Sequence, residues 1–338
     1  MKVSSQRWLA LAVFSYWVRP AFWSEEHLEM IRILSEDKLV PYSCDLAGVL
    51  NYPEKLEELN VWLRSLNERG QFGLLSLSHD SSAPVDDLLL DNSVVLRTSM
   101  QSDLQYKNEF PLPVFVEGKE FEDWTPIAKS KKPKIGFVGH SKLSLHHKLL
   151  NAGDDDSRKE YGYGIASGGE VLRTPVNIGL VIRSKALRLL RSDSRISTSF
   201  IERETRYFDG GVFGSQARAE YLSNLDANSY SLCIRGSGNY SIRMYEAMAK
   251  GRIPVTVDTN IRLPLDDYRD WSGLGLFLKI HELDAIGQRL IEFHESLSDQ
   301  KFINLQKSIR AFWESSLRRE SYLTAAIPRI MNALVPNA

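Results

Sequence analysis

The chain has 338 residues, of which 43% are hydrophobic and 25% charged, and its 42 basic residues nearly balance 43 acidic ones. This balance argues against a protein that binds nucleic acid or anionic membrane through its overall charge. The length favours two domains over one. Cys44 and Cys233 lie far apart in apolar sequence, which is typical of reduced packing residues in a reducing compartment.

The N-terminal apolar run, residues 8–18 (WLALAVFSYWV), is too short to span a bilayer. The segment RPAFWSEEH that follows it contains no small-residue cleavage site. The aromatic and β-branched content of residues 8–18 is instead typical of a buried strand. We therefore predict the first strand of a cytoplasmic protein with no transmembrane segment, and peripheral attachment to a membrane stays open.

Helices and strands alternate along the first part of the chain. Ser24 precedes two glutamates and an apolar pattern, which predicts an N-cap and a helix. Residues 53–70 predict a longer helix that begins at Pro53 and ends at Gly70. FGLLSLS and SVVLRTS have the length and apolarity of strands. The proline-rich, charged stretch 108–134 indicates a linker, and we place the boundary between a domain of residues 1–127 and one of residues 128–338.

The second part of the chain repeats the alternation. KIGFVGH predicts a strand, residues 174–193 predict an amphipathic helix that contains Arg183, and ISTSFI and SQARAEYLSNLDAN predict a strand and a helix. Two or three helices follow at the C-terminus, and whether they pack back on the N-terminal domain stays open. Strands that alternate with helices favour parallel sheets with helices on both faces. The predicted fold class is α/β, with two Rossmann-like domains.

Residues 231–258, SLCIRGSGNYSIRMYEAMAKGRIPVTVD, place a glycine loop between a strand and a helix that begins near Asn239 or Ser241. Ligands of open parallel sheets bind where the strands end, and the start of a helix binds anions. Arg235 and Arg243 can bind phosphate, and the Glu246 carboxylate can accept from ribose hydroxyls. This spacing predicts a nucleotide diphosphate site. The alternative is an exposed ion pair between Arg243 and Glu246 after an ordinary turn.

The same residues carry a resemblance. The run from Tyr221 to Trp271 resembles the exostosin-like glycosyltransferase family. It contains the motifs IRGSG, SIRMYEA, GRIPV, LP and DWS in the same order as that family and at similar spacing. KIGFVGH is similar to the strand and glycine turn that open the second domain of that family. The resemblance implies the GT-B architecture, with two parallel sheets that face a cleft. It also implies sugar transfer, with inversion, from a UDP- or GDP-linked donor to a glycan or glycolipid acceptor, in polysaccharide biosynthesis.

The resemblance also implies roles for single residues. Its predicted diphosphate cradle consists of Arg235, Gly236, Ser237 and Ser241. Arg243 and Arg183 would contact the phosphates, and Glu246 would hold the ribose. The family's Gly-x-Asp-His-Phe element is missing from the N-terminal half. His79 and Asp80 follow a predicted strand there and are the candidates for the base that takes the acceptor proton, although Asp80 could equally be a turn residue.

We expect no cofactor and no metal. The Asp-x-Asp string at residues 154–156 follows LLNAG instead of an apolar strand, which favours a solvated loop. His140, His146 and His147 match no standard zinc spacing. Two other functions stay open. One is a catalytically degenerate nucleotide-binding protein of the same fold. The other is a dehydrogenase-like enzyme, which is disfavoured because no Gly-x-Gly-x-x-Gly follows an early strand.

Overall fold

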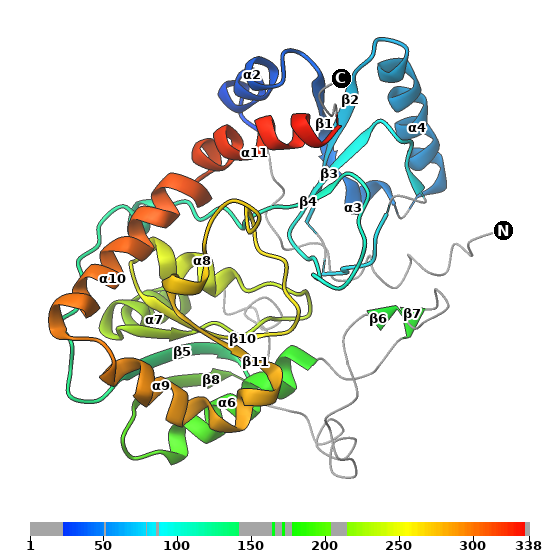
Figure 1. The fold of residues 1–338 in the computed structure, drawn as a ribbon. Coiled ribbons are helices and arrows are strands. Elements are labelled where there is room, and N and C mark those ends of the chain that lie inside the picture. The colour runs from blue at the N-terminus through cyan, green and yellow to red at the C-terminus, as the bar shows by residue number, and fades with distance from the viewer. Residues whose placement is uncertain are drawn as a thin grey trace.

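The computed structural model describes residues 23–50, 52–78, 80–85, 88–141, 164–165, 171–172, 178–203 and 215–334. Two separate parallel sheets organise these residues (Figure 1). The predicted fold class, α/β with two Rossmann-like domains, is confirmed. The first strand expected at residues 8–18 lies outside the described residues. The domain boundary after residue 127 stays a prediction.

The first sheet has the order β1-β2-β3-β4, with every pair parallel. Its elements are α2 (Glu25–Leu34), β1 (Leu39–Asp45), α3 (Leu46–Val49), α4 (Pro53–Asn67), β2 (Phe72–Leu77), β3 (Ser93–Arg97) and β4 (Glu109–Pro111). As predicted, Ser24 caps α2, with its hydroxyl accepting from the His27 amide. Strand β1, which contains Pro41, was not predicted from the sequence. An edge strand tolerates a proline, and Pro41 pairs with Leu74 at the edge of this sheet.

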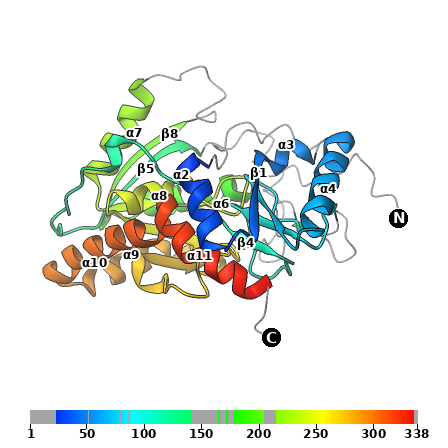
Figure 2. The same ribbon diagram turned by 90° about the horizontal axis from the view of Figure 1, so that it is seen from above.

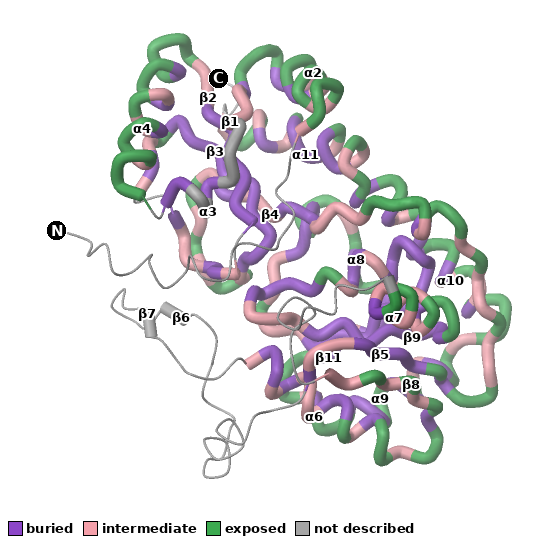
Figure 3. Tube along the Cα trace, turned by 180° about the vertical axis from the view of Figure 1, so that it is seen from behind, coloured by how far each residue is buried: buried purple, intermediate pink, exposed green. Residues whose placement is uncertain are grey.

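Alternate residues of the first sheet face opposite layers, as the pleat of a strand requires. Leu74 and Leu96 belong to a core with helix α2, whereas Leu75 and Val95 belong to a second core with α3 and α4. Both faces are therefore covered, which is the usual condition of a parallel sheet. The buried strands stand out from the exposed helical surface in Figure 3.

The second sheet has the order β11-β10-β9-β5-β8 and is also wholly parallel. Its strands are β5 (Lys134–His140), β8 (Ser197–Arg203), β9 (Tyr230–Leu232), β10 (Ile253–Asp258) and β11 (Leu276–Lys279). Its first strand, β5, lies between the second and the third. The strand order therefore reverses at β5 and β9, which are neighbours. This topological switch point is where doubly wound sheets bind ligands.

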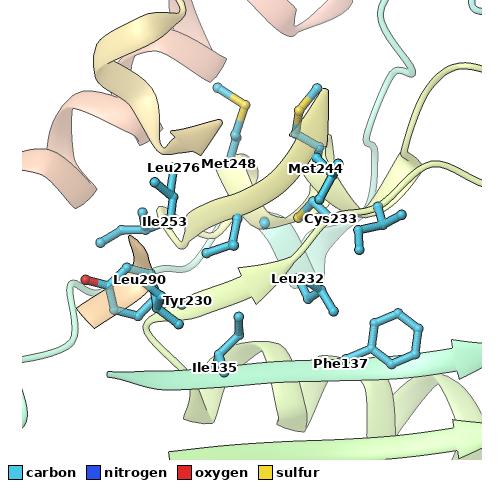
Figure 4. Close-up of a cluster of buried hydrophobic side chains, with 14 of the residues drawn as sticks. Ile135, Phe137, Tyr230, Leu232, Cys233, Met244, Met248, Ile253, Leu276 and Leu290 are labelled. Carbon is cyan, nitrogen blue, oxygen red and sulfur yellow. The ribbon is translucent and has the colours of Figure 1, made fainter. Parts of the chain in front are cut away.

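Helices α6 (Ile178–Ser192), α7 (Ser215–Ala227), α8 (Ile242–Ala249), α9 (Ile286–Glu295) and α10 (Asp299–Phe312) accompany the second sheet (Figure 1). Shorter elements are η3 (Lys119–Phe121), η4 (Ser272–Leu274), η5 (Ile280–Ala285), the π-turn η6 (Trp313–Leu317) and the antiparallel pair β6 (Gly164–Ile165) and β7 (Val171–Leu172). The core of this domain lies between strands and helices, where Ile135, Leu232, Met248, Ile253 and Leu290 are buried (Figure 4).

The last helix, α11 (Arg319–Leu334), leaves the second domain and lies beside α2 on the first (Figures 1 and 2). Leu323, Ile327 and Ile330 are buried there in one core with Leu74 and Val94 of the first sheet. The C-terminal helix therefore completes the N-terminal domain. Of the helices in the described ranges, none is both long and apolar enough to cross a membrane.

Candidate functional site

The candidate site lies at the carboxyl end of the second sheet, at its switch point. Three predicted arginines reach this edge from different segments: Arg183 from α6, Arg235 from the loop after β9, and Arg243 from α8. Their guanidinium groups bind main-chain carbonyls of β5 and of the segment after β9. The topology therefore brings together side chains that are up to 60 residues apart (183 to 243).

Arg235, like Arg183 and Arg243, is half-buried. Its Nη2 donates to the Ser237 carbonyl at 2.8 Å, and its Nε is buried with no hydrogen-bond partner in the described part of the chain. Burial lowers the pKa of Arg235 to about 10, and the negative charge of Asp80 only partly offsets this effect. A buried cation without full compensation is unfavourable. A bound anion would supply the missing counter-charge.

Arg243 and Arg183 both lie close to the ring of Phe137. Arg243 Nη2 donates to the Val138 carbonyl at 2.5 Å, and its guanidinium carbon lies 4.4 Å from the Phe137 ring centre. Arg183 donates to the carbonyls of His140 at 2.6 Å and Arg235 at 2.8 Å. Its guanidinium carbon is 5.6 Å from the same ring. Carbonyl and ring contacts orient these groups without neutralising their charge.

The loop after β9 approaches α6 closely. A Cβ at Gly179, in the first turn of α6, would overlap the Gly236 carbonyl and lie 2.5 Å from that of Arg235. Gly236 itself has open space where a Cβ would stand. Ser241 is the N-cap of α8, as predicted, and its side chain makes no capping bond. The Met244 amide donates to the Ser241 carbonyl at 3.0 Å. The Ser241 hydroxyl caps none of the first amides of α8, and amides at a helix start can bind an anion.

Glu246 lies one turn further along α8, and helix α7 binds both of its oxygens. Arg218 Nη1 donates to Oε1 at 2.8 Å, and the Tyr221 hydroxyl donates to Oε2 at 2.6 Å. Glu246 is thus not the ion-pair partner of Arg243 that the alternative interpretation expected. Each carboxylate oxygen keeps a further lone pair for a hydroxyl donor. Its role toward a ribose stays a prediction.

Asp80 reaches the same place from the first domain. The Tyr240 hydroxyl donates to Asp80 Oδ1 at 3.2 Å, and a Cβ at Gly238 would lie 2.8 Å from that oxygen. The structure therefore brings Asp80 to the Arg235 loop, whereas His79 lies outside the described residues. Arg183, Arg235, Arg243 and Asp80 meet at one edge, and Glu246 flanks them through its contacts with α7.

A buried ion pair holds the loop that carries Asp80. Arg97 Nη1 lies 2.5 Å from Glu109 Oε2, and both side chains are only 1% exposed. Arg97 also donates to the carbonyls of Ser81 and Ala83, and Glu109 Oε1 accepts from the Val85 amide. Buried ion pairs of this kind persist when further hydrogen bonds satisfy their remaining atoms.

No protein-family model and no curated protein matches this chain. Similar solved structures include TarM of S. aureus, with 12% identity and a TM-score of 0.40 over 83% of this chain and 46% of that one. A glycosyltransferase from Rickettsia africae has 10% identity and a TM-score of 0.39, over 93% and 83% of the two chains. The GtfA/B complex has 9% identity and a TM-score of 0.40, over 83% and 60%.

This chain spans about half the length of the TarM chains that it matches. At these identities and TM-scores the likeness carries no functional conclusion. The fold assignment stands on the strand order of the two sheets. The structural basis for a function is therefore the cluster of Arg183, Arg235 and Arg243 together with Asp80.

No group of three or more His, Cys, Asp or Glu side chains that could hold a metal occurs within the ranges described. His146, His147 and residues 154–156 lie outside those ranges, so metal independence stays a prediction. His140 contributes its carbonyl to Arg183.

Sequence reasoning missed several residues of the site: Phe137, Arg218, Tyr221, Asn239 and Tyr240. Asn239 and Tyr240 lie inside the glycine loop of residues 231–258, and polar groups that follow a strand end are typical of a ligand site. Arg218 and Tyr221 lie on a different helix from Glu246. Only the packing of α7 against β5 and α8 identifies them as its partners.

Proposed function

We propose that this chain is a glycosyltransferase of GT-B architecture that transfers a sugar from a nucleotide-diphosphate donor to a hydroxyl acceptor. The observation that carries the proposal is the half-buried guanidinium of Arg235, beside the switch point of a parallel sheet. Its Nε has no hydrogen-bond partner within the described residues, and its Nη2 binds only a main-chain carbonyl. A diphosphate supplies the anionic oxygens that such a group binds best. A UDP- or GDP-linked sugar carries this diphosphate as its leaving group.

The transfer reaction would develop negative charge on the leaving diphosphate, next to the three arginines. The acceptor oxygen attacks the anomeric carbon, the bond from that carbon to the diphosphate oxygen breaks, and the diphosphate leaves with the electron pair. Arg235, Arg243, Arg183 and the start of α8 would stabilise that negative charge. Gly236 and Ser237 would leave room for the phosphates, Ser241 would bind them, and Glu246 would accept from the ribose hydroxyls.

Asp80 is the proposed base, and it would take the proton of the acceptor hydroxyl in a single displacement with inversion. Support comes from its position on the first domain, beside the Arg235 loop of the second, where Tyr240 donates to one carboxylate oxygen. The second oxygen has lone pairs for the acceptor hydroxyl. No metal enters this proposal, because the arginines and the helix start supply the positive charge.

The first experiment measures nucleotide binding and sugar transfer with UDP, GDP and their sugar derivatives. A nucleotide that binds only the folded chain raises the melting temperature, and calorimetry gives its affinity. Arg235→Ala should lower turnover about 10²- to 10³-fold, because the cation faces the charge that develops in the transition state. Arg195→Ala is the matched control, since Arg195 lies on the surface and pairs with Asp193, and should leave turnover unchanged.

Asp80→Asn separates catalysis from binding. It should lower turnover by about two to four orders of magnitude while donor affinity is kept. A wild-type chain that binds neither UDP nor GDP would contradict the proposed function. Tight nucleotide binding with no transfer and no donor hydrolysis would favour the second candidate, the catalytically degenerate nucleotide-binding protein.

A further inference from the structure

The two domains are joined at the site by three loops. These loops are residues 98–103 after β3, residues 236–241 between β9 and α8, and residues 259–262 after β10. The Ser102 amide donates to the Asn260 carbonyl at 2.8 Å, and Gln101 and Ile261 form an antiparallel bridge. The first domain is thus held to the second beside the arginine cluster.

Asn239 lies at the centre of this junction and is fully buried. Its Nδ2 donates to the carbonyls of Met100 at 3.0 Å, Thr259 at 3.2 Å and Asn260 at 3.2 Å. Its Oδ1 accepts from the Thr259 hydroxyl at 2.6 Å. One amide side chain therefore ties the arginine loop to the loop after β3 and to the loop after β10. A buried amide with all its polar atoms used strongly specifies one arrangement.

Ser99, which is also fully buried, carries the connection to Asp80. Its Oγ accepts from the Asn239 amide at 2.9 Å and donates to the Asp80 carbonyl at 3.0 Å. Because its single hydrogen is used on Asp80, the Ser82 hydroxyl, 2.8 Å away, is the donor in their contact. Two hydrogen bonds in series therefore join the arginine loop to the main chain of Asp80.

We propose that Asn239 and Ser99 are positioning residues that fix the Asp80 carboxylate against the Arg235 loop. The proposal rests on the function proposed above, in which Asp80 is the base and Arg235 holds the leaving group. These two groups come from different domains, so a shift between the domains changes the distance between base and donor. Asn239 and Ser99 prevent that shift without touching either reacting group.

The kinetic test uses Ser99→Ala and Asn239→Ala, with Asp103→Ala as the control. Displacing a catalytic group by about 1 Å costs about 10²-fold in rate, so each test variant should lower kcat about 10- to 100-fold and leave nucleotide affinity within about threefold. Asp103 accepts from Asn260 at the exposed rim of the same junction, and its replacement should leave kcat unchanged. Ser99→Ala removes a single hydroxyl, so it tests the proposal if Asn239→Ala does not fold.

A second measurement needs no nucleotide. Spin labels at Val61→Cys on α4 and Ile280→Cys on η5, in a Cys44→Ser background, report the distance between the two domains. Both positions are exposed, and Cys233 is buried away from the label. The otherwise unmutated labelled protein should give a narrow distance distribution and Ser99→Ala a broader one.

An unchanged distribution in both Ser99→Ala and Asn239→Ala would overturn the positioning role. So would a broader distribution with unchanged kcat, or a loss of nucleotide affinity equal to the loss of kcat. Failure of the proposed function is a separate outcome: the wild-type chain would then bind neither UDP nor GDP, whatever the spin-label distances.

Discussion

At the scale of the residue, the partner of each charged group decides what it can do. Arg195 and Arg32 are exposed and each pairs with a nearby carboxylate, and surface pairs of this kind contribute little to stability. Arg235 and Arg243 bind carbonyls, and neither forms a salt bridge with a carboxylate in the part of the chain that the structure covers. A carbonyl orients a guanidinium but leaves its charge available to a ligand. Arginines that bind carbonyls instead of carboxylates therefore mark the candidate site more specifically than arginine residues in general do.

Glu246→Gln tests the proposed ribose contact. The amide keeps the shape of the side chain but loses the strong double acceptor, so nucleotide affinity should fall by about 1.5–3 kcal/mol. Calorimetric titration with UDP and GDP measures this change. The variant should also melt at a lower temperature, because Arg218 loses a charged partner.

Glu120→Gln is the control for this prediction, since Glu120 is the other carboxylate bound to Arg218, at 3.1 Å. It should change stability by no more than about 1 kcal/mol and leave affinity unchanged. Equal effects of the two variants on affinity would assign Glu246 a purely structural role with α7.

At the scale of the element, the site depends on how closely α6 approaches the loop after β9. Arg183 of α6 donates to the carbonyls of Ile234 and Arg235, and Gly179 packs against the same stretch of main chain. A side chain at the start of α6 would push the helix away from these carbonyls. The position of Arg235 is thus set by a neighbouring helix as well as by its own strand.

Gly179→Ala should therefore disturb the site through the backbone. Alanine favours a helix more than glycine does, by up to about 1 kcal/mol, but its Cβ would overlap the Gly236 carbonyl. Overpacking of this kind costs about 1–3 kcal/mol, so thermal unfolding should show a lower melting temperature and titration a weaker nucleotide affinity. Gly273→Ala, where a Cβ meets open space, should change neither. A more stable variant with full affinity would show that α6 can move without consequence.

At the scale of the whole molecule, α11 makes the two domains interdependent. The chain crosses back from the second domain, and Tyr322, Leu323 and Ile327 of α11 are buried in the core of the first. The Tyr322 hydroxyl also donates to the Pro111 carbonyl at the end of β4. The first domain cannot complete its core until the last helix of the chain is in place.

Ile327→Ala should lower the free energy of unfolding by about 2–5 kcal/mol, because it leaves a cavity in a fully buried core. Differential scanning calorimetry should still record one transition, since α11 and the loops around Asn239 join the domains. Thr324→Ala, on the exposed side of α11, should have a much smaller effect. Two transitions, of which only one shifts, would contradict this coupling.

Local patterns in the sequence were sufficient for much of the fold. The N-cap at Ser24, the helix that begins at Pro53, and the strand, glycine loop and helix of residues 231–258 were predicted from signals within a few residues of each position. The resemblance at IRGSG and SIRMYEA predicted Arg235, Arg243 and Glu246 as site residues. Strand β1 was not predicted, and its Pro41 is compatible with a strand only because β1 lies at the edge of the sheet.

The tertiary structure alone decided which of these residues act together. The switch point between β5 and β9 follows from strand order, and no local pattern records strand order. The partners of Glu246 on α7, the contacts of two arginines with the ring of Phe137, and the approach of Asp80 to the Arg235 loop are contacts between distant segments. Asn239 joins two domains through bonds to residues that are 20, 21 and 139 positions away. Sequence patterns of helices and strands report on neighbours along the chain, whereas a site between two domains is made by segments that only folding brings together.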